Sequence, residues 1–153
     1  MPSSSRLSRE LLTTGAVFYY RDFEGHTETK DRYFIVVGAN ETQFFCFTTS
    51  TSERLIYSPS LASQATPIIP KGSECFRKPC VVDCTELVAF DDIQISSYLN
   101  SRRVTLEGTL SGERVRWIAR TVKKSAVLNE RELRVVQDAL AEYWERDAEP
   151  TGE

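Results

Sequence analysis

The chain has 153 residues, 41% of them hydrophobic and 27% charged, with a formal net charge of −3. This length fits one domain over 1–153, because two domains would each be small for a separate core. No run approaches the roughly 18 apolar residues of a membrane helix, and the polar start lacks the apolar core of a secretory signal. We therefore expect a cytoplasmic protein without membrane contact. The acidic balance argues against a protein that coats nucleic acids through charge alone.

The N-terminal third combines strand patterns with polar segments. Residues 5–12 carry a short helical pattern. The aromatic and β-branched run at 16–20 predicts a first strand, and the polar run at 21–32 predicts a long surface loop. Two strongly apolar runs, 33–37 and 43–49, predict adjacent strands of a hairpin, because only a short polar turn separates them.

Shorter strand patterns follow after a serine- and threonine-rich segment that we expect to be a loop. The run at 66–70 predicts a short extended piece, and 80–84 predicts a strand. A further strand is predicted from 89–90 together with 93–95.

The C-terminal part changes to a helical period. Four apolar residues recur at i, i+3, i+4 and i+7: Val115, Ile118, Ala119 and Val122. Ser111 is the expected N-cap of this helix. Asn129, with Glu132 three residues later, has the pattern of a capping box, which predicts an additional helix over 129–146 and a frayed tail over 147–153. Short strands followed by helices predict an α+β domain, mainly antiparallel, whose strands commonly curl into a small barrel.

The four cysteines are Cys46, Cys75, Cys80 and Cys84. The last three are close in sequence but lack the C-x2-C spacing typical of zinc sites, and the one histidine, His26, lies far away in sequence. Reduced, buried strand thiols are the favoured interpretation, with a zinc site as the alternative. We expect no metal and no cofactor.

Charge is unevenly distributed along the second half. The segment 102–124 has seven basic and two acidic residues, whereas 129–153 has three basic and eight acidic residues. The basic segment is either an ordinary solvated helix face or a surface for RNA phosphates. On the second interpretation, Arg120 and Lys124 are substrate-binding residues. An acidic partner segment is a further alternative.

The common signatures of phosphate-loop, Rossmann, zinc-protease and serine-hydrolase sites are absent from the sequence. What remains is Arg32, at the start of one apolar strand, and three hydroxyl residues at the end of the next: Thr48, Thr49 and Ser50. A hairpin brings these ends together. Arginine and hydroxyl groups can hold a phosphate, and arginine can stabilise the charge of a phosphoryl transition state. The residues alone favour a plainer interpretation, with Arg32 in a surface ion pair and threonines as strand formers.

The same residues carry a family resemblance. The segments involved are Gly15-Ala16-Val17, Lys30-Asp31-Arg32-Tyr33-Phe34-Ile35-Val36-Val37 and Phe47-Thr48-Thr49-Ser50, followed by Val81-Val82-Asp83 and Gly108-Thr109-Leu110-Ser111. In this order, over about 14–122, they resemble the PemK/MazF toxin superfamily. Its pattern is a G-x-[VI] strand, a K-x-R-P-x-[LIV]-V-[LIV] strand and a strand ending in T-[TS]. Tyr33 stands where that family usually has proline.

The resemblance implies an SH3-like small curled barrel and a homodimer. It also implies a metal-independent endoribonuclease that cleaves single-stranded RNA and is inhibited by an antitoxin protein. Arg32 matches the catalytic arginine, and Thr48 or Thr49 matches the catalytic hydroxyl position. The 2′-hydroxyl of RNA then attacks the adjacent phosphate while Arg32 stabilises the developing charge. Further substrate-binding residues are assigned to Lys30, His26 and Ser50. The alternative is a non-catalytic SH3-like module that binds a protein or nucleic-acid partner in the same groove.

Overall fold

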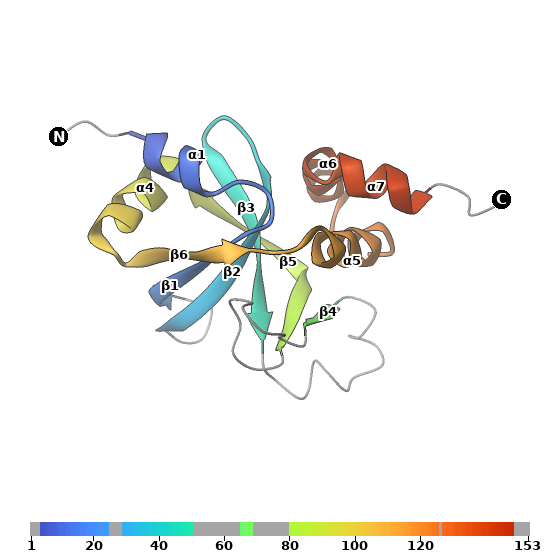
Figure 1. The fold of residues 1–153 in the computed structure, drawn as a ribbon, viewed down its shortest axis with the longest axis horizontal. Helices are drawn as coiled ribbons and strands as arrows, with labels where there is room; N and C mark the ends of the chain where they lie inside the picture. The colour runs from blue at the N-terminus through green and yellow to red at the C-terminus, as the bar shows by residue number, and fades with distance from the viewer. Residues whose placement is uncertain (1–3, 25–28, 51–64, 69–79, 126, 149–153) are drawn as a thin grey trace.

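The computed structural model describes residues 4–24, 29–50, 65–68, 80–125 and 127–148. In this part of the chain, six strands form one antiparallel sheet: β1 (Ala16–Glu24), β2 (Thr29–Ala39), β3 (Gln43–Ser50), β4 (Ala65–Ile68), β5 (Cys80–Asp91) and β6 (Val104–Thr109). The helices are α1 (Arg6–Leu11), α4 (Asp92–Ser101), α5 (Gly112–Lys123), α6 (Glu130–Ala139) and α7 (Ala141–Ala148). Figure 1 shows α1 and α4 at one side of the sheet and α5 to α7 at the other. The predicted α+β class is confirmed.

The sheet is curled but open. Its strand order is β4-β5-β3-β2-β1-β6, so within the described residues the two outer strands each pair with one neighbour only. The β1–β2 pairing shifts register between Tyr20 and Phe23, and the β2–β3 pairing shifts between Val36 and Gly38. Such bulges bend strands and increase their twist. The expected curled antiparallel sheet is therefore present, without the closure of a complete barrel.

The predicted hairpin is confirmed. β2 and β3 are antiparallel neighbours, with Phe34 opposite Thr48 and Val36 opposite Cys46. The side chain of Asn40 sets the connecting turn, because its carbonyl oxygen accepts hydrogen bonds from the backbone N–H groups of Thr42 and Gln43. The strong apolar runs thus predicted both the strands and their pairing.

The prediction of a long loop over 21–32 is wrong. β1 continues to Glu24 and β2 begins at Thr29, and these two residues are paired. Polar side chains are tolerated here because they lie on an exposed part of the hairpin. The carboxylate of Asp31 accepts hydrogen bonds from the Tyr19 hydroxyl, at 2.7 Å, and from the backbone N–H of Asp22, at 2.9 Å. The polar residues therefore stabilise the pairing through side-chain contacts that the strand pattern does not reveal.

The strand predicted at 93–95 is also wrong, because these residues belong to α4. The side chain of Asp91 caps that helix by accepting from the backbone N–H of Gln94. Two isoleucines separated by one polar residue, Ile93 and Ile95, have the spacing of a strand face. In the helix they point in different directions, and Ile93 is exposed whereas Ile95 is buried. The following strand β6 was not predicted, because its sequence, VTLEGT, contains only two large apolar residues.

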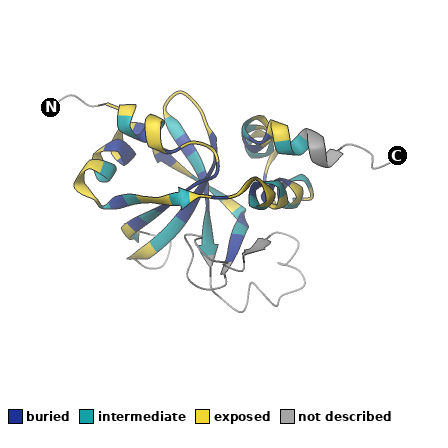
Figure 2. Ribbon diagram, in the orientation of Figure 1, coloured by how far each residue is buried: buried dark blue, intermediate teal, exposed yellow. Residues whose placement is uncertain are grey.

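Each face of the sheet has its own core. Alternate residues such as Val17, Ile35 and Phe47 pack under α5 and α6, whereas Phe18 and Phe34 pack on the face that also carries Ile95 of α4. Figure 2 shows the buried residues concentrated along the sheet and on the inner sides of the helices. Because successive strand residues face opposite sides, neighbouring residues of one strand belong to different cores.

The C-terminal helices follow the predicted caps, with one difference. The Ser111 side chain accepts from the backbone N–H of Arg114, and Asn129 and Glu132 form the reciprocal capping box. However, the single helix predicted over 129–146 is two helices, α6 and α7, separated at Leu140. Leu140 is fully buried in the core under α5, so the break lies at a core residue. α7 extends to Ala148, and the rest of the predicted tail lies outside the described residues.

We expect Asn129→Ala to lower the free energy of unfolding by about 1 kcal/mol, because it removes the N-cap acceptor of α6. Urea denaturation followed by circular dichroism measures this change. Asn100→Ala is the matched control, because Asn100 is exposed in α4, and its effect should stay within about 0.5 kcal/mol. Equal effects of the two substitutions would contradict a stabilising capping box.

Candidate functional site

A cavity of about 470 Å³ lies between the end of β1, the first half of β2, the end of β3 and the middle of β5. Its walls are formed by Phe23, Glu24, Arg32, Phe34, Thr48, Asp83, Glu86, Leu87, Val88 and Ala89. This volume is within the range of pockets that hold small ligands or parts of larger ones. The cavity therefore joins apolar side chains to a small set of charged and hydroxyl groups.

Strand alternation explains why these groups meet. Arg32 and Phe34 are two residues apart in β2, so they share one face of the sheet. Phe34 is opposite Thr48 of β3, and Thr48 is opposite Asp83 of β5. Phe34, Thr48 and Asp83 thus form one row across three neighbouring strands, and Arg32 lies beside this row, toward the start of β2.

A bulge in β5 completes the cavity. Cys46 pairs with Val88 but Thr48 pairs with Asp83, so β5 has extra residues between these two positions. Glu86 and Leu87 belong to this bulge and line the cavity. Bulges commonly redirect side chains beside functional sites, and here the bulge adds a carboxylate to the wall.

The two threonines of β3 face opposite sides. Thr48 lines the cavity, and its hydroxyl donates to the backbone carbonyl of Tyr33 at 3.0 Å. Thr49 is opposite Val82, which is buried in the core under α5. The sequence left the choice between these two threonines open, and the geometry favours Thr48 as the hydroxyl beside Arg32.

The charges in the cavity are mixed. Arg32 is half-buried, and no side chain among the described residues pairs with its guanidinium. Three carboxylates share the walls, those of Glu24, Asp83 and Glu86. Asp83 accepts hydrogen bonds from the backbone N–H of Thr85, at 3.0 Å, and from its hydroxyl, at 2.5 Å. Arg32 can hold a phosphate, whereas a carboxylate can accept a proton or bind a cation.

Of the other predicted substrate-binding residues on the strands, the structure describes the side chain of Lys30 alone. Lys30 is exposed on β2 and does not line the cavity. His26 lies outside the described residues, and so does the side chain of Ser50, at the end of β3. Their predicted contacts with substrate stay predictions.

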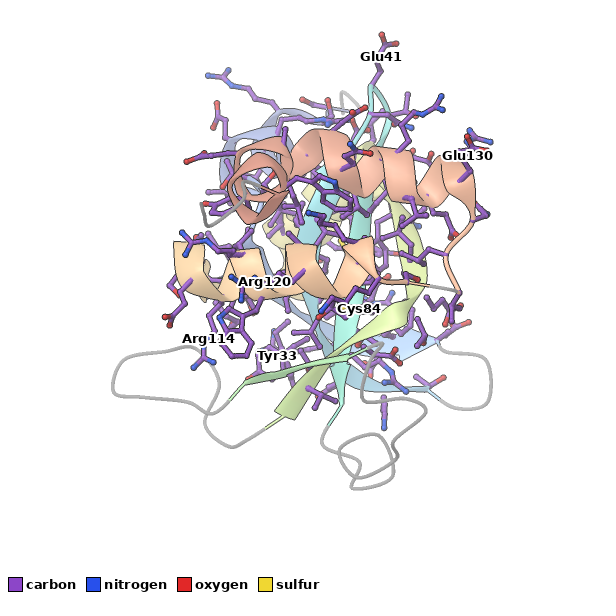
Figure 3. The ribbon with its side chains drawn as sticks, turned by 90° about the vertical axis from the view of Figure 1, so that its right-hand side faces the viewer. Tyr33, Glu41, Cys84, Arg114, Arg120 and Glu130 are labelled. Carbon is purple, nitrogen blue, oxygen red and sulfur yellow. The ribbon has the colours of Figure 1, made fainter. Side chains whose placement is uncertain are left out.

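Arg120 and Lys124 are exposed at the C-terminal half of α5 and its cap. α5 covers the face of the sheet that carries Ile35, whereas the cavity lies on the face that carries Phe34. The sheet therefore separates these two cations from Arg32. Figure 3 shows Arg120 on the outer side of α5.

The sequence interpretation missed the three carboxylates. Glu24 fell within the segment taken as a loop, and Glu86 lies in a bulge that the sequence pattern does not predict. Asp83 carried a usable signal, since it is a charged residue inside the apolar strand Val81–Cys84. A carboxylate in such a position needs a polar surrounding, and the cavity and Thr85 supply it.

The cysteine thiols agree with the simpler prediction as far as the structure describes them. Cys46 and Cys84 are buried and reduced, and burial raises the pKa of the Cys46 thiol well above its usual value. Cys75 and the side chain of Cys80 lie outside the described residues. Within the described part, no three histidine, cysteine, aspartate or glutamate side chains gather as metal ligands.

Comparisons of the chain with protein-family models, with curated proteins and with solved structures give no significant match. In the part of the chain that the structure describes, no helix has the length and apolarity needed to cross a membrane.

Proposed function

We propose that the chain is a metal-independent endoribonuclease toxin that cleaves single-stranded RNA. The observation that supports this proposal is that Arg32 and Thr48, which match the two catalytic positions of the PemK/MazF pattern, line one cavity. Arg32 has no described side-chain partner, so its donors can bind a phosphate. Thr48 places a hydroxyl on the same wall.

The proposed reaction is an intramolecular phosphoryl transfer. The 2′-oxygen of one nucleotide forms a bond to the adjacent phosphorus, and the bond from phosphorus to the 5′-oxygen of the next nucleotide breaks. The products are a 2′,3′-cyclic phosphate and a 5′-hydroxyl. Arg32 stabilises the extra negative charge of the transition state. The Thr48 hydroxyl, which donates to the Tyr33 carbonyl in the structure, turns to donate to the phosphate and so orients it.

The attacking 2′-hydroxyl must lose a proton, and the leaving 5′-oxygen must gain one. Arg32 is a poor base because arginine stays protonated at all physiological pH values. The carboxylates of Glu24, Asp83 and Glu86 are the groups of the described cavity walls that have the chemistry of a general base. The mixed charge of the cavity is thus compatible with acid–base chemistry on a phosphodiester.

We expect the purified chain to cleave single-stranded RNA in the presence of excess chelator, and its induced expression to arrest growth. Mass spectrometry of the fragments should find 2′,3′-cyclic phosphate and 5′-hydroxyl ends, because no water enters the first step. Cleavage that stops when chelator is added would contradict the metal-independent reaction. Absence of cleavage under both conditions would contradict the ribonuclease.

The proposal includes a cytoplasmic homodimer and an antitoxin protein that inhibits it. The outer edge of β6 supports an interface with a second copy. Within the described residues β6 pairs with β1 alone, and Leu106 of this strand is exposed. Unpaired edges bind further strands readily.

A second candidate is a non-catalytic module that binds a protein segment with basic side chains. The cavity walls carry three carboxylates and one arginine, so their net charge is negative and favours a basic segment. The apolar walls supply contact area for it. A chain that cleaves no RNA but binds a peptide rich in lysine and arginine supports this second candidate. Weaker binding by a Glu24→Gln, Asp83→Asn variant then assigns the peptide to the cavity.

A further inference from the structure

The outer face of α5 carries an exposed tryptophan. Trp117 is 49% exposed, the largest apolar side chain among those exposed in the described residues. The opposite face of α5 holds the helix on the sheet through buried Val115, Ile118 and Val122. Trp117 therefore contributes little to this core, although exposing so large a ring to water is unfavourable.

Basic side chains surround this ring. Arg114 precedes Trp117 by three residues, Arg120 follows by three and Lys124 by seven, spacings that lie on one side of a helix. Arg120 and Lys124 are exposed, and α5 contains one acidic residue, Glu113. Figure 3 shows Arg120 on the outer side of α5 and Arg114 below the helix, at its edge. The chain as a whole is acidic, so this is a local concentration of positive charge.

We propose that this face of α5 binds single-stranded RNA, with Trp117 stacking on a base and with Arg120 and Lys124 contacting phosphates. Flat aromatic side chains flanked by cations are the usual means of holding single strands without regard to sequence. An acidic protein segment matches the positive charge of this face alone, whereas a nucleobase also covers the exposed ring of Trp117. Charge and aromatic exposure together favour the nucleic acid.

Two further aromatic rings lie on the same face of the sheet. Tyr33 packs against the core beneath α5, and Figure 3 shows it close to that helix. Its ring centroid is 4.9 Å from that of Tyr19, and the Arg21 guanidinium lies 5.5 Å from the centre of the Tyr19 ring. Aromatic rings and a cation thus lie on β1 and β2 as well as on α5, together with the Asp31 carboxylate that accepts from the Tyr19 hydroxyl.

This site is separate from the cavity, because the sheet lies between them. It rests on the proposed function in one respect, that single-stranded RNA is the substrate, and it adds an anchoring surface outside the cavity. Binding is therefore measured apart from cleavage, in a chain that carries Arg32→Ala.

The experiment titrates this Arg32→Ala chain against a labelled single-stranded RNA of about 16 nucleotides, the upper site size of single-strand binding modules, and measures fluorescence anisotropy. Adding Trp117→Ala should weaken binding by about 10-fold, within the range for loss of one stacked base. Adding Arg120→Glu with Lys124→Glu should weaken binding and reduce the log–log salt slope by about 1.4, since each phosphate contact contributes about 0.7. Val127→Ala, at an exposed residue outside α5, is the control and should bind RNA as its parent does.

Unchanged affinity and salt slope in both α5 variants would overturn the inference. It would also be overturned if the chain bound poly-glutamate through α5 and bound no RNA. If the chain with Arg32 intact cleaves no RNA while the α5 variants lose binding, the ribonuclease proposal fails and the RNA site on α5 stands. If it cleaves RNA while the α5 variants bind normally, the ribonuclease stands and the α5 site fails.

Discussion

Arg32→Ala should lower the rate of single-stranded RNA cleavage by about 10²-fold or more, the usual effect of removing one donor that stabilises a developing oxyanion. Arg32 is the one cation among the described residues that line the cavity, so no neighbour replaces its charge. Single-turnover cleavage of a labelled RNA measures the change. The fold should be unaffected, because no described side chain pairs with the Arg32 guanidinium.

Two variants test whether this loss is specific. Arg6→Ala removes the same charge from an exposed residue of α1, whose side chain is 84% exposed, and should cleave RNA at the unaltered rate. Arg32→Lys keeps the charge but not the planar pair of donors, so it should recover only part of the activity. Full activity in Arg32→Ala would show that Arg32 takes no part in the reaction. The cavity would then be explained better as a binding site for a basic protein segment.

The sequence was most informative where apolar residues form long runs. The strands at 33–37 and 43–49 followed from their apolar residues, and their pairing followed from the short turn between them. The face of α5 that packs on the sheet followed from the helical spacing of its apolar residues. Caps were equally predictable, because Ser111 and Asn129 act through local hydrogen bonds whose spacing is fixed. Each of these features depends on residues close together in the sequence.

Three of the errors arose where a distant contact decides the structure. The polar hairpin end is stabilised by Asp31, whose partners Tyr19 and Asp22 are 12 and 9 residues away. β6 forms because β1 offers it an edge, and Leu140 breaks the C-terminal helix where the core accepts its side chain. No local pattern contains this information.

In the candidate site, too, some features follow from local sequence and others depend on distant contacts. The meeting of Arg32 with the end of β3 was predictable, because a hairpin with a short turn fixes which ends are close. The choice of Thr48 over Thr49 required the register, and the carboxylates required β5 and its bulge. The basic run on α5 was visible in the sequence, but its separation from the cavity by the sheet was not.

The largest expected effect on stability is at Phe18, in the core beside the cavity. Its side chain is fully buried, and its ring lies 5.6 Å from that of Phe34 and 5.7 Å from that of Phe90. Phe18→Ala removes these contacts and leaves a void that the surrounding strands can only partly fill. We expect the free energy of unfolding to fall by about 3–5 kcal/mol, a large part of the roughly 5–15 kcal/mol that stabilises a typical domain.

Urea denaturation followed by circular dichroism measures this loss, and Phe18→Leu provides a smaller step if the alanine variant does not fold. Val127→Ala is the matched control, because Val127 is 55% exposed and lies outside both cores of the sheet. Its effect should stay within about 0.5 kcal/mol. Similar losses at the two positions would contradict the assignment of Phe18 to the core, because both changes shorten an apolar side chain and differ chiefly in burial. A large loss at Phe18 alone would show that the core on the face of Arg32 and Thr48 stabilises the fold. The packing of Phe18 against Phe34 then holds one wall of the cavity in place.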